Sequence, residues 1–240
     1  MRHGEVIMNS LKDKLLNILL YPARIFEKLT DKRATLYAGI VLIGAIDLLL
    51  PDAAAVLKFL FTGKTENVVY MNAALAVIVL LVLGVIDVVF IGVPLFDFFK
   101  FIKKKEGKVL FIQGQEKENE QNTLPVIKME DRASVASRIK IMKIYIMSHF
   151  IIIPVSIIIH YSFLRYVEAD SPAWMQYLAL AIFMLIFIWS AAILTRGINT
   201  LFRFNPIFAR LTFIIVFTWN YLFSMVFDMQ IMNWLLKLFR

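Results

Sequence analysis

Runs of apolar residues long enough to cross a lipid bilayer constrain this chain more than any other feature. One run, residues 69–94, contains a single charged side chain, Asp87. About 20 apolar residues span the hydrocarbon core as a helix, because a helix satisfies its own backbone hydrogen bonds. The 240 residues are 60% hydrophobic, as several such runs would require. The sequence therefore predicts an all-α, polytopic membrane protein.

Five runs of this kind predict a bundle of five transmembrane helices. The connection between the first two is short, so we expect them to form an antiparallel hairpin with its tip outside the cytoplasm. A short amphipathic tail, too short to cross again, follows the last run. The predicted spans are residues 35–57, 69–94, 144–163, 174–195 and 207–227.

The long polar interval at residues 96–143 sets the expected orientation, because it carries eleven Lys or Arg. Lys and Arg beside membrane spans stay in the cytoplasm. On this topology 21 of the 26 basic residues lie inside. We expect a multi-pass protein of the cell membrane with a cytoplasmic N-terminus and an extracytoplasmic C-terminus. Its parts are a cytoplasmic amphipathic segment (1–34), a transmembrane hairpin (35–94), a basic cytoplasmic loop (95–143), and spans three to five with the tail (144–240).

Two cytoplasmic stretches mix apolar with basic side chains, a composition suited to the headgroup layer. Residues 11–29 predict two short interfacial helices, and residues 96–105 combine aromatic rings with Lys. Alternatively, the short helices pack on the protein's own cytoplasmic face, and the rings are ordinary flanking anchors. The middle of the loop, residues 113–123, has too few apolar side chains to order itself. The expected contacts with the membrane surface or a partner are Leu11, Leu15, Phe26, Phe98, Phe101, Lys103, Lys104 and Lys105.

The chain has a net charge of +8, and its basic residues lie beside apolar spans. Anionic lipid headgroups are a simpler partner for such residues than nucleic acid. We therefore expect membrane lipids and a membrane protein complex as partners and no nucleic acid, with homo-oligomers left open. The chain has no Cys, so it has neither a disulfide framework nor thiolate metal ligands.

Four of the polar side chains inside the predicted spans are candidate site residues: Asp47, Asp87, His149 and Asn220. A charge at the bilayer centre costs about 2.5 to 3.5 kcal/mol on insertion scales, so such groups need partners. Their depths, at about 1.5 Å per residue, suggest pairing Asp87 with His149 and Asp47 with Asn220. The groups would then form either a proton or cation relay or hydrogen bonds that hold the helices together.

Enzyme signatures are missing from the sequence. The three histidines, His3, His149 and His160, do not have the spacing of a zinc hydrolase. There is no Gly-x-Ser-x-Gly elbow, no phosphate-binding loop and no Gly-x-Gly-Asp pattern of intramembrane aspartyl proteases. We expect no catalytic residues, no metal and no cofactor.

The segment Tyr21-Pro22-Ala23-Arg24-Ile25-Phe26-Glu27-Lys28-Leu29 looks like the Pro-x-x-x-Phe-Glu-x-Leu entry to the first span in bacterial members of the Yip family, the Ypt/Rab-interacting membrane proteins. Asp47-Leu48-Leu49-Leu50-Pro51 is similar to the Asp-Leu-x-Gly-Pro motif of eukaryotic members, with Leu50 in place of Gly. The five-span plan also resembles this family. The resemblance implies a non-enzymatic membrane protein that recruits or scaffolds other proteins, here in a bacterial plasma membrane.

Two functional hypotheses follow. The first is a scaffold or accessory protein at the cytoplasmic membrane surface, for example of an export or transport complex. The second is a small transporter or channel that uses Asp47, Asp87 and His149. Transporters usually need internal repeats or oligomers, and here the only internal match is residues 42–47 with residues 82–87, on antiparallel helices that need not share a role. A polar cavity at mid-membrane would favour the transporter, and a packed apolar core the scaffold.

Overall fold

The computed structural model describes residues 14, 17–61, 66–118, 137–167, 170–232 and 234, without the side chains of residues 49–57, 59–61, 66–69, 107–118, 165, 228–229 and 232. Within this part of the chain every regular element is helical. The elements are α2 (Ala23–Glu27), α3 (Arg33–Phe61), α4 (Glu66–Glu118), α5 (Arg138–Ser162), η2 (Leu164–Tyr166), α6 (Ala173–Phe202), α7 (Pro206–Val226) and η3 (Phe227–Met232).

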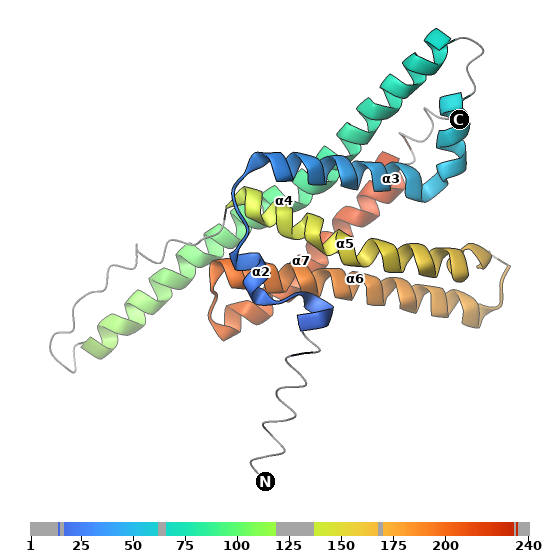
Figure 1. Cartoon of the computed structure of the whole chain (residues 1–240). Coiled ribbons are helices and arrows are strands. Elements are labelled where there is room, and N and C mark those ends of the chain that lie inside the picture. The colour runs from blue at the N-terminus through green and yellow to red at the C-terminus, as the bar shows by residue number, and fades with distance from the viewer. Residues whose placement is uncertain are drawn as a thin grey trace.

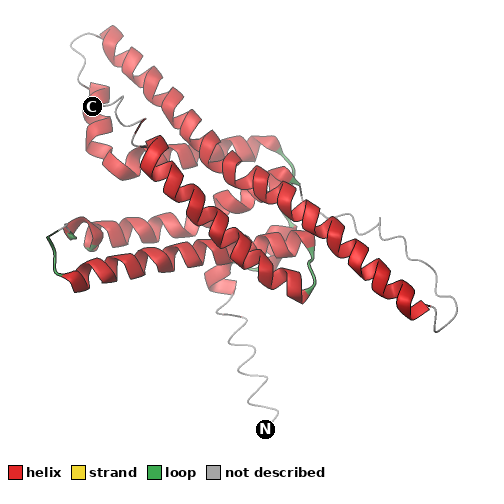
Figure 2. Ribbon diagram, turned by 180° about the vertical axis from the view of Figure 1, so that it is seen from behind, coloured by secondary structure: helices red, strands yellow, loops and turns green. Residues whose placement is uncertain are grey.

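The helices form one bundle in which sequence neighbours run antiparallel. Figure 1 shows α5 and α6 side by side, joined at one end by η2 and the following turn. Figure 2, seen from behind, puts α4 and α7 in front of that pair and oblique to it. At one end of the bundle α3, α5 and α7 begin and α6 ends, near Arg33, Arg138 and Arg203. We call this the basic end.

Four helices are long and apolar enough to cross a membrane: α5, α6, α7 and the part of α4 from Tyr70 to Glu106. This supports a multi-pass membrane protein. The predicted first span corresponds to α3, a 29-residue helix whose side chains are described mainly up to Leu48. The count of five spans therefore stays a prediction.

The helix that contains the predicted second span does not end at Pro94, because α4 continues through Pro94 to Glu118. Proline has no N–H, so it leaves the carbonyl four residues earlier, that of Phe90, without its helical partner. The indole Nε1 of Trp219 in α7 donates to this Phe90 oxygen at 3.2 Å. A tertiary contact thus supplies the missing bond and lets the helix pass through the proline.

This continuation also changes the status of residues 96–118, which were expected to form the first part of a loop. They are helical, and Phe99 is fully buried among protein side chains. Its ring lies 6.2 Å from that of Phe202 and 5.8 Å from that of Phe204, centroid to centroid. Helix α4 therefore packs against the α6–α7 turn at the basic end. In the remainder of the predicted loop, residues 119–136 lie outside the described residues, and residues 138–143 form the start of α5.

Helices α3 and α4 cross at two glycines in closest contact. A Cβ added to Gly44 would lie 1.9 Å from the Leu80 carbonyl oxygen, and one added to Gly84 would lie 2.1 Å from that of Ile40. Only glycine allows the two backbones to approach this closely. The two glycines sit at the same place in the matching stretches 42–47 and 82–87, so the internal match of the sequence is a reciprocal helix crossing.

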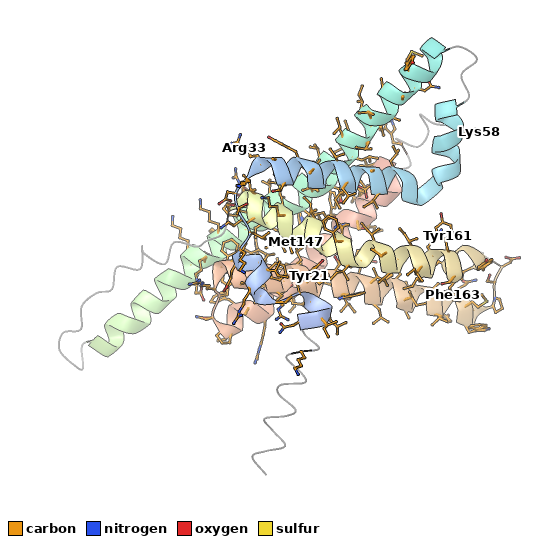
Figure 3. All side chains as sticks on the ribbon, in the orientation of Figure 1. Tyr21, Arg33, Lys58, Met147, Tyr161 and Phe163 are labelled. Atoms are coloured by element: carbon orange, nitrogen blue, oxygen red, sulfur yellow. The ribbon has the colours of Figure 1, made fainter. Side chains whose placement is uncertain are left out.

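The N-terminal segment packs on the bundle. Phe26 of α2 is fully buried, so its predicted exposure to lipid or a partner is wrong, and the alternative of packing on the protein itself holds for this residue. Figure 3 shows Tyr21 beside Met147, whose carbonyl accepts a bond from the Tyr21 hydroxyl at 3.4 Å. Burial raises the pKa of the Tyr21 phenol, which keeps it a hydrogen-bond donor. Leu11 and Leu15 lie outside the described residues.

Candidate functional site

Asp87 of α4 and two side chains of α5 form the polar centre of the bundle. The Tyr145 hydroxyl donates to Asp87 Oδ1 at 2.7 Å. His149 Nε2 lies 3.9 Å from Asp87 Oδ2. Asp87 is buried and His149 is half-buried. The structure thus brings together the Asp87 and His149 that sequence depth had paired, and adds Tyr145, which sequence reasoning missed.

The hydrogen bond of the His149 ring determines which ring nitrogen can bind a second proton. Its Nδ1 lies 2.9 Å from the Tyr145 carbonyl oxygen. A carbonyl oxygen only accepts, so Nδ1 carries a hydrogen in both charge states of the ring. The nitrogen that gains or loses a proton is then Nε2, the one facing Asp87. A proton on Nε2 would therefore lie beside the Asp87 carboxylate.

A cavity of about 340 Å³ adjoins these residues. It lies between α3, α4, α5, α6, α7 and η3, so one chain is enough to form it. Half of its lining residues are polar, although they lie in predicted or candidate spans. The polar lining residues are Asp47, Asp87, Tyr145, His149, Ser156, His160, Ser190, Asn220 and Ser224.

The glycine crossing places both aspartates on this cavity. Asp47 and Asp87 each follow their crossing glycine by three residues, on helices of opposite direction. At 1.5 Å per residue, they lie on opposite sides of the crossing, about 9 Å apart along the bundle. The matching stretches therefore contribute one carboxylate each to the same cavity, which sequence reasoning had not inferred.

Asn220 lines the cavity as well, and its Nδ2 lies 3.5 Å from Ser190 Oγ of α6 as a hydrogen-bond donor. Asp47, which was predicted to pair with Asn220, lines the same cavity. A relay and a purely structural role for these groups both stay open at this level. The cavity shows that the polar groups of five helices converge.

A periodic signal in α5 could have identified three of the missed residues. Tyr145, His149, Ser156 and His160 follow one another at intervals of four, seven and four residues. Such spacing puts side chains on one face of a helix. Since Tyr145 and His160 are 15 residues apart, this polar stripe runs for about 22 Å. It leads from Asp87 toward the end of the bundle that is opposite the basic end.

Beyond the cavity, toward the basic end, the bundle is filled. On α5, α6 and α7 the lining begins at Tyr145, Ser190 and Asn220. One turn nearer the basic end, Ile141 of α5, Leu194 of α6 and Val216 of α7 are fully buried. We call the two parts the packed half and the hollow half.

Polar bonds fasten the packed half at its outer edge. Glu106 of α4 is 2% exposed, and its two carboxylate oxygens accept from the Asn205 backbone N–H at 2.8 Å and from Lys103 Nζ at 2.7 Å. Lys103 Nζ also donates to the Arg203 carbonyl at 2.9 Å. These bonds, the Glu106 clamp, tie α4 to the α6–α7 turn. Lys103, predicted to be a surface contact, is therefore engaged within the protein.

The other predicted surface residues of α4 are open to solvent. Phe98 and Phe101 are large exposed apolar side chains, and Lys104 and Lys105 are exposed. The Lys105 ammonium lies 4.8 Å from the centre of the Phe101 ring. This face of α4 alternates rings and ammonium groups as the sequence indicated.

Among the described residues there is no group of three His, Cys, Asp or Glu that could hold a metal ion. No family model, no curated protein and no solved structure matches the chain. The resemblance to the Yip family stays a prediction.

Proposed function

We propose that this protein is a small membrane carrier that binds a solute in the hollow half of its bundle. The observation that supports it is the 340 Å³ cavity with its polar lining. Each of the two carboxylates within the spans is costly to insert, and their convergence on one cavity supports a role beyond anchoring. Cavities of this size suit small molecules. Of the two hypotheses raised by the sequence, the transporter is favoured.

In this proposal, the carrier is held in a conformation that is closed at the basic end. Passage to that side requires the packed half to separate, and the Glu106 clamp opposes it. Asp87, Tyr145 and His149 lie at the boundary between the two halves. A solute bound beside them would change their charge balance and could thereby bias the conformation. Asp47 provides a second carboxylate nearer the entrance.

Cysteine chemistry tests this function directly, because the chain has no Cys. Ser190→Cys places a thiol on the cavity near its inner end. We expect water-soluble, membrane-impermeant methanethiosulfonates of either charge to react with it in both right-side-out and inverted vesicles. Reaction should be faster from the side opposite the basic end. The reagents attack only a thiolate, which needs water.

Two control thiols set the background. Ser148→Cys lies on α5 with its side chain fully buried outside the cavity, and Ile188→Cys lies on an exposed position of α6. Both should react far more slowly than Ser190→Cys. Reaction from one side alone would indicate a binding site without transport, and no reaction from either side would refute the carrier.

The basic end of the carrier faces the cytoplasm in this proposal. The support is that Lys103, Lys140, Arg138 and Arg203 gather there. Impermeant reagents should label Lys104→Cys only in inverted vesicles and Asp170→Cys only in right-side-out vesicles of the host cell membrane. The reverse pattern would overturn the orientation.

A second role, as an accessory protein, draws on one observation: the exposed rings and ammonium groups of Phe98, Phe101, Lys104 and Lys105. Such a face suits anionic headgroups or a partner complex. Photo-crosslinkers at Phe98 and Phe101 in native membranes should capture lipid or a defined protein. If substitution of these residues leaves growth unchanged, and no crosslink exceeds that at the exposed control position Tyr177, the accessory role is refuted.

A further inference from the structure

The charged groups of the cavity have one sign. Its titratable lining residues are Asp47 of α3, Asp87 of α4, and Tyr145, His149 and His160 of α5, while α6, α7 and η3 contribute none. Among the described residues no Lys or Arg lines it. With the carboxylates ionised and the imidazoles neutral, the cavity carries two negative charges. It therefore attracts cations and repels anions.

The size and the ligands of the cavity argue against a bare metal ion. A metal ion needs several donor atoms converging within about 2 to 2.6 Å. The described residues offer no cluster of three His, Asp or Glu. A volume of 340 Å³ also far exceeds the roughly 30 Å³ of a water molecule. The cavity suits a cation with an organic body.

Aromatic rings share the cavity with the carboxylates. Phe183 and Phe187 of α6 have ring centroids 4.7 Å apart, and Phe223 and Phe227 lie 5.6 Å apart. All four line the cavity together with Asp47 and Asp87. Aromatic rings attract organic cations and cover their apolar parts. A ligand in the cavity would therefore meet both negative charge and phenyl rings.

We infer that the cavity binds a monovalent organic cation with an apolar body, which exchanges for a proton held between Asp87 and His149. The inference deepens the proposed carrier and rests on it. When the cation arrives, the proton shared by Asp87 and His149 Nε2 leaves to solution, so the charge of the cavity is conserved. Cation binding therefore weakens as the solution becomes more acidic.

The test compares reagents that differ only in charge. At Ser190→Cys, a cationic methanethiosulfonate (trimethylammonium head) should react faster than an anionic one (sulfonate head), after normalisation to a free thiol. One carboxylate at roughly 6 Å in water changes this ratio about tenfold. At alkaline pH, where the proton shared by Asp87 and His149 has left, Asp87→Asn and Asp47→Asn should each reduce the ratio by about that factor. Asp97→Asn, which alters an exposed carboxylate bonded to Arg138, should leave it unchanged.

Ligand protection identifies the chemical class. Benzyltrimethylammonium should slow modification of Ser190→Cys by an uncharged hydroxyethyl methanethiosulfonate. Phenylmethanesulfonate, of similar size and opposite charge, and Na⁺ or K⁺ at equal ionic strength should not. Protection should fall at acidic pH and should be at least about threefold weaker in Asp87→Asn. The thermal unfolding of this variant and its rate with the uncharged reagent show whether it folds.

The outcomes separate the two proposals. Reaction from both sides without a charge preference, or protection by the sulfonate, overturns the organic cation and leaves the carrier intact. Protection by Na⁺ or K⁺ as strong as by the organic cation overturns the requirement for an apolar body. Absence of any reaction overturns the carrier, and this inference with it.

Discussion

The packed half and the hollow half are made by the same helices, yet they use their side chains in opposite ways. In the packed half Phe26, Phe99 and Phe202 are almost completely buried, and Glu106 is bonded on both oxygens. In the hollow half Asp47, Asp87 and His149 face a cavity. Burial of large side chains stabilises a fold, whereas polar groups around a cavity cost stability. The contrast assigns stability to the packed half and, in the proposed function, solute binding to the hollow half.

The largest expected effect of a substitution lies in the packed half. Phe26→Ala removes a fully buried ring and should lower the free energy of unfolding by about 3 to 5 kcal/mol. Phe101→Ala, at a side chain that is 55% exposed, should change it by no more than about 0.5 kcal/mol. Thermal and denaturant unfolding in detergent measures both. Equal effects would mean that α2 does not belong to the packed half.

The Glu106 clamp comes next. Glu106→Ala leaves the half-buried Asn205 N–H without its acceptor and removes one of the two acceptors of Lys103 Nζ, and should cost about 2 to 3 kcal/mol. It should also speed labelling of Ser190→Cys from the basic side. The matched control, Asp97→Ala, breaks the exposed pair with Arg138 and should cost less than about 1 kcal/mol. Unchanged labelling from the basic side would show that the clamp does not restrict access.

The helix crossing separates the halves and should show an intermediate effect. Gly84→Ala places a Cβ against the rigid Ile40 carbonyl and should cost about 1 to 3 kcal/mol. Gly92→Ala would meet first the flexible side chain of Met142 at 2.3 Å, which can move, so its cost should be smaller. Comparing the two unfolding temperatures checks this, and a larger loss at Gly92 would contradict the crossing as described.

The smallest stability change is expected in the hollow half. Tyr145→Phe removes the hydrogen bond to Asp87, and should cost about 1 kcal/mol or less because water in the cavity can replace it. The ionised carboxylate loses a donor, so the pH at which benzyltrimethylammonium protection is half lost should move upward. A large loss of stability with an unmoved pH midpoint would place Tyr145 in the structural framework instead.

Local patterns in the sequence predicted part of this structure well. Apolar runs identify the four spans that the structure supports, since their length and composition do not depend on neighbours. Depth along the spans paired Asp87 with His149 correctly, because both positions are counted from helix ends. The spacing of Tyr145, Ser156 and His160 was equally available, as all three lie on one face of α5 with His149.

The sequence by itself thus determined which segments form helices long and apolar enough to cross a membrane, and which polar groups they carry. Tertiary structure alone decided that α4 passes through Pro94, because the missing hydrogen bond is supplied by Trp219, 129 residues away. It also decided that Gly44 and Gly84 meet, and that Asp47 and Asp87 therefore share a cavity. Hydropathy and periodicity describe one helix at a time, whereas a cavity depends on how the helices cross.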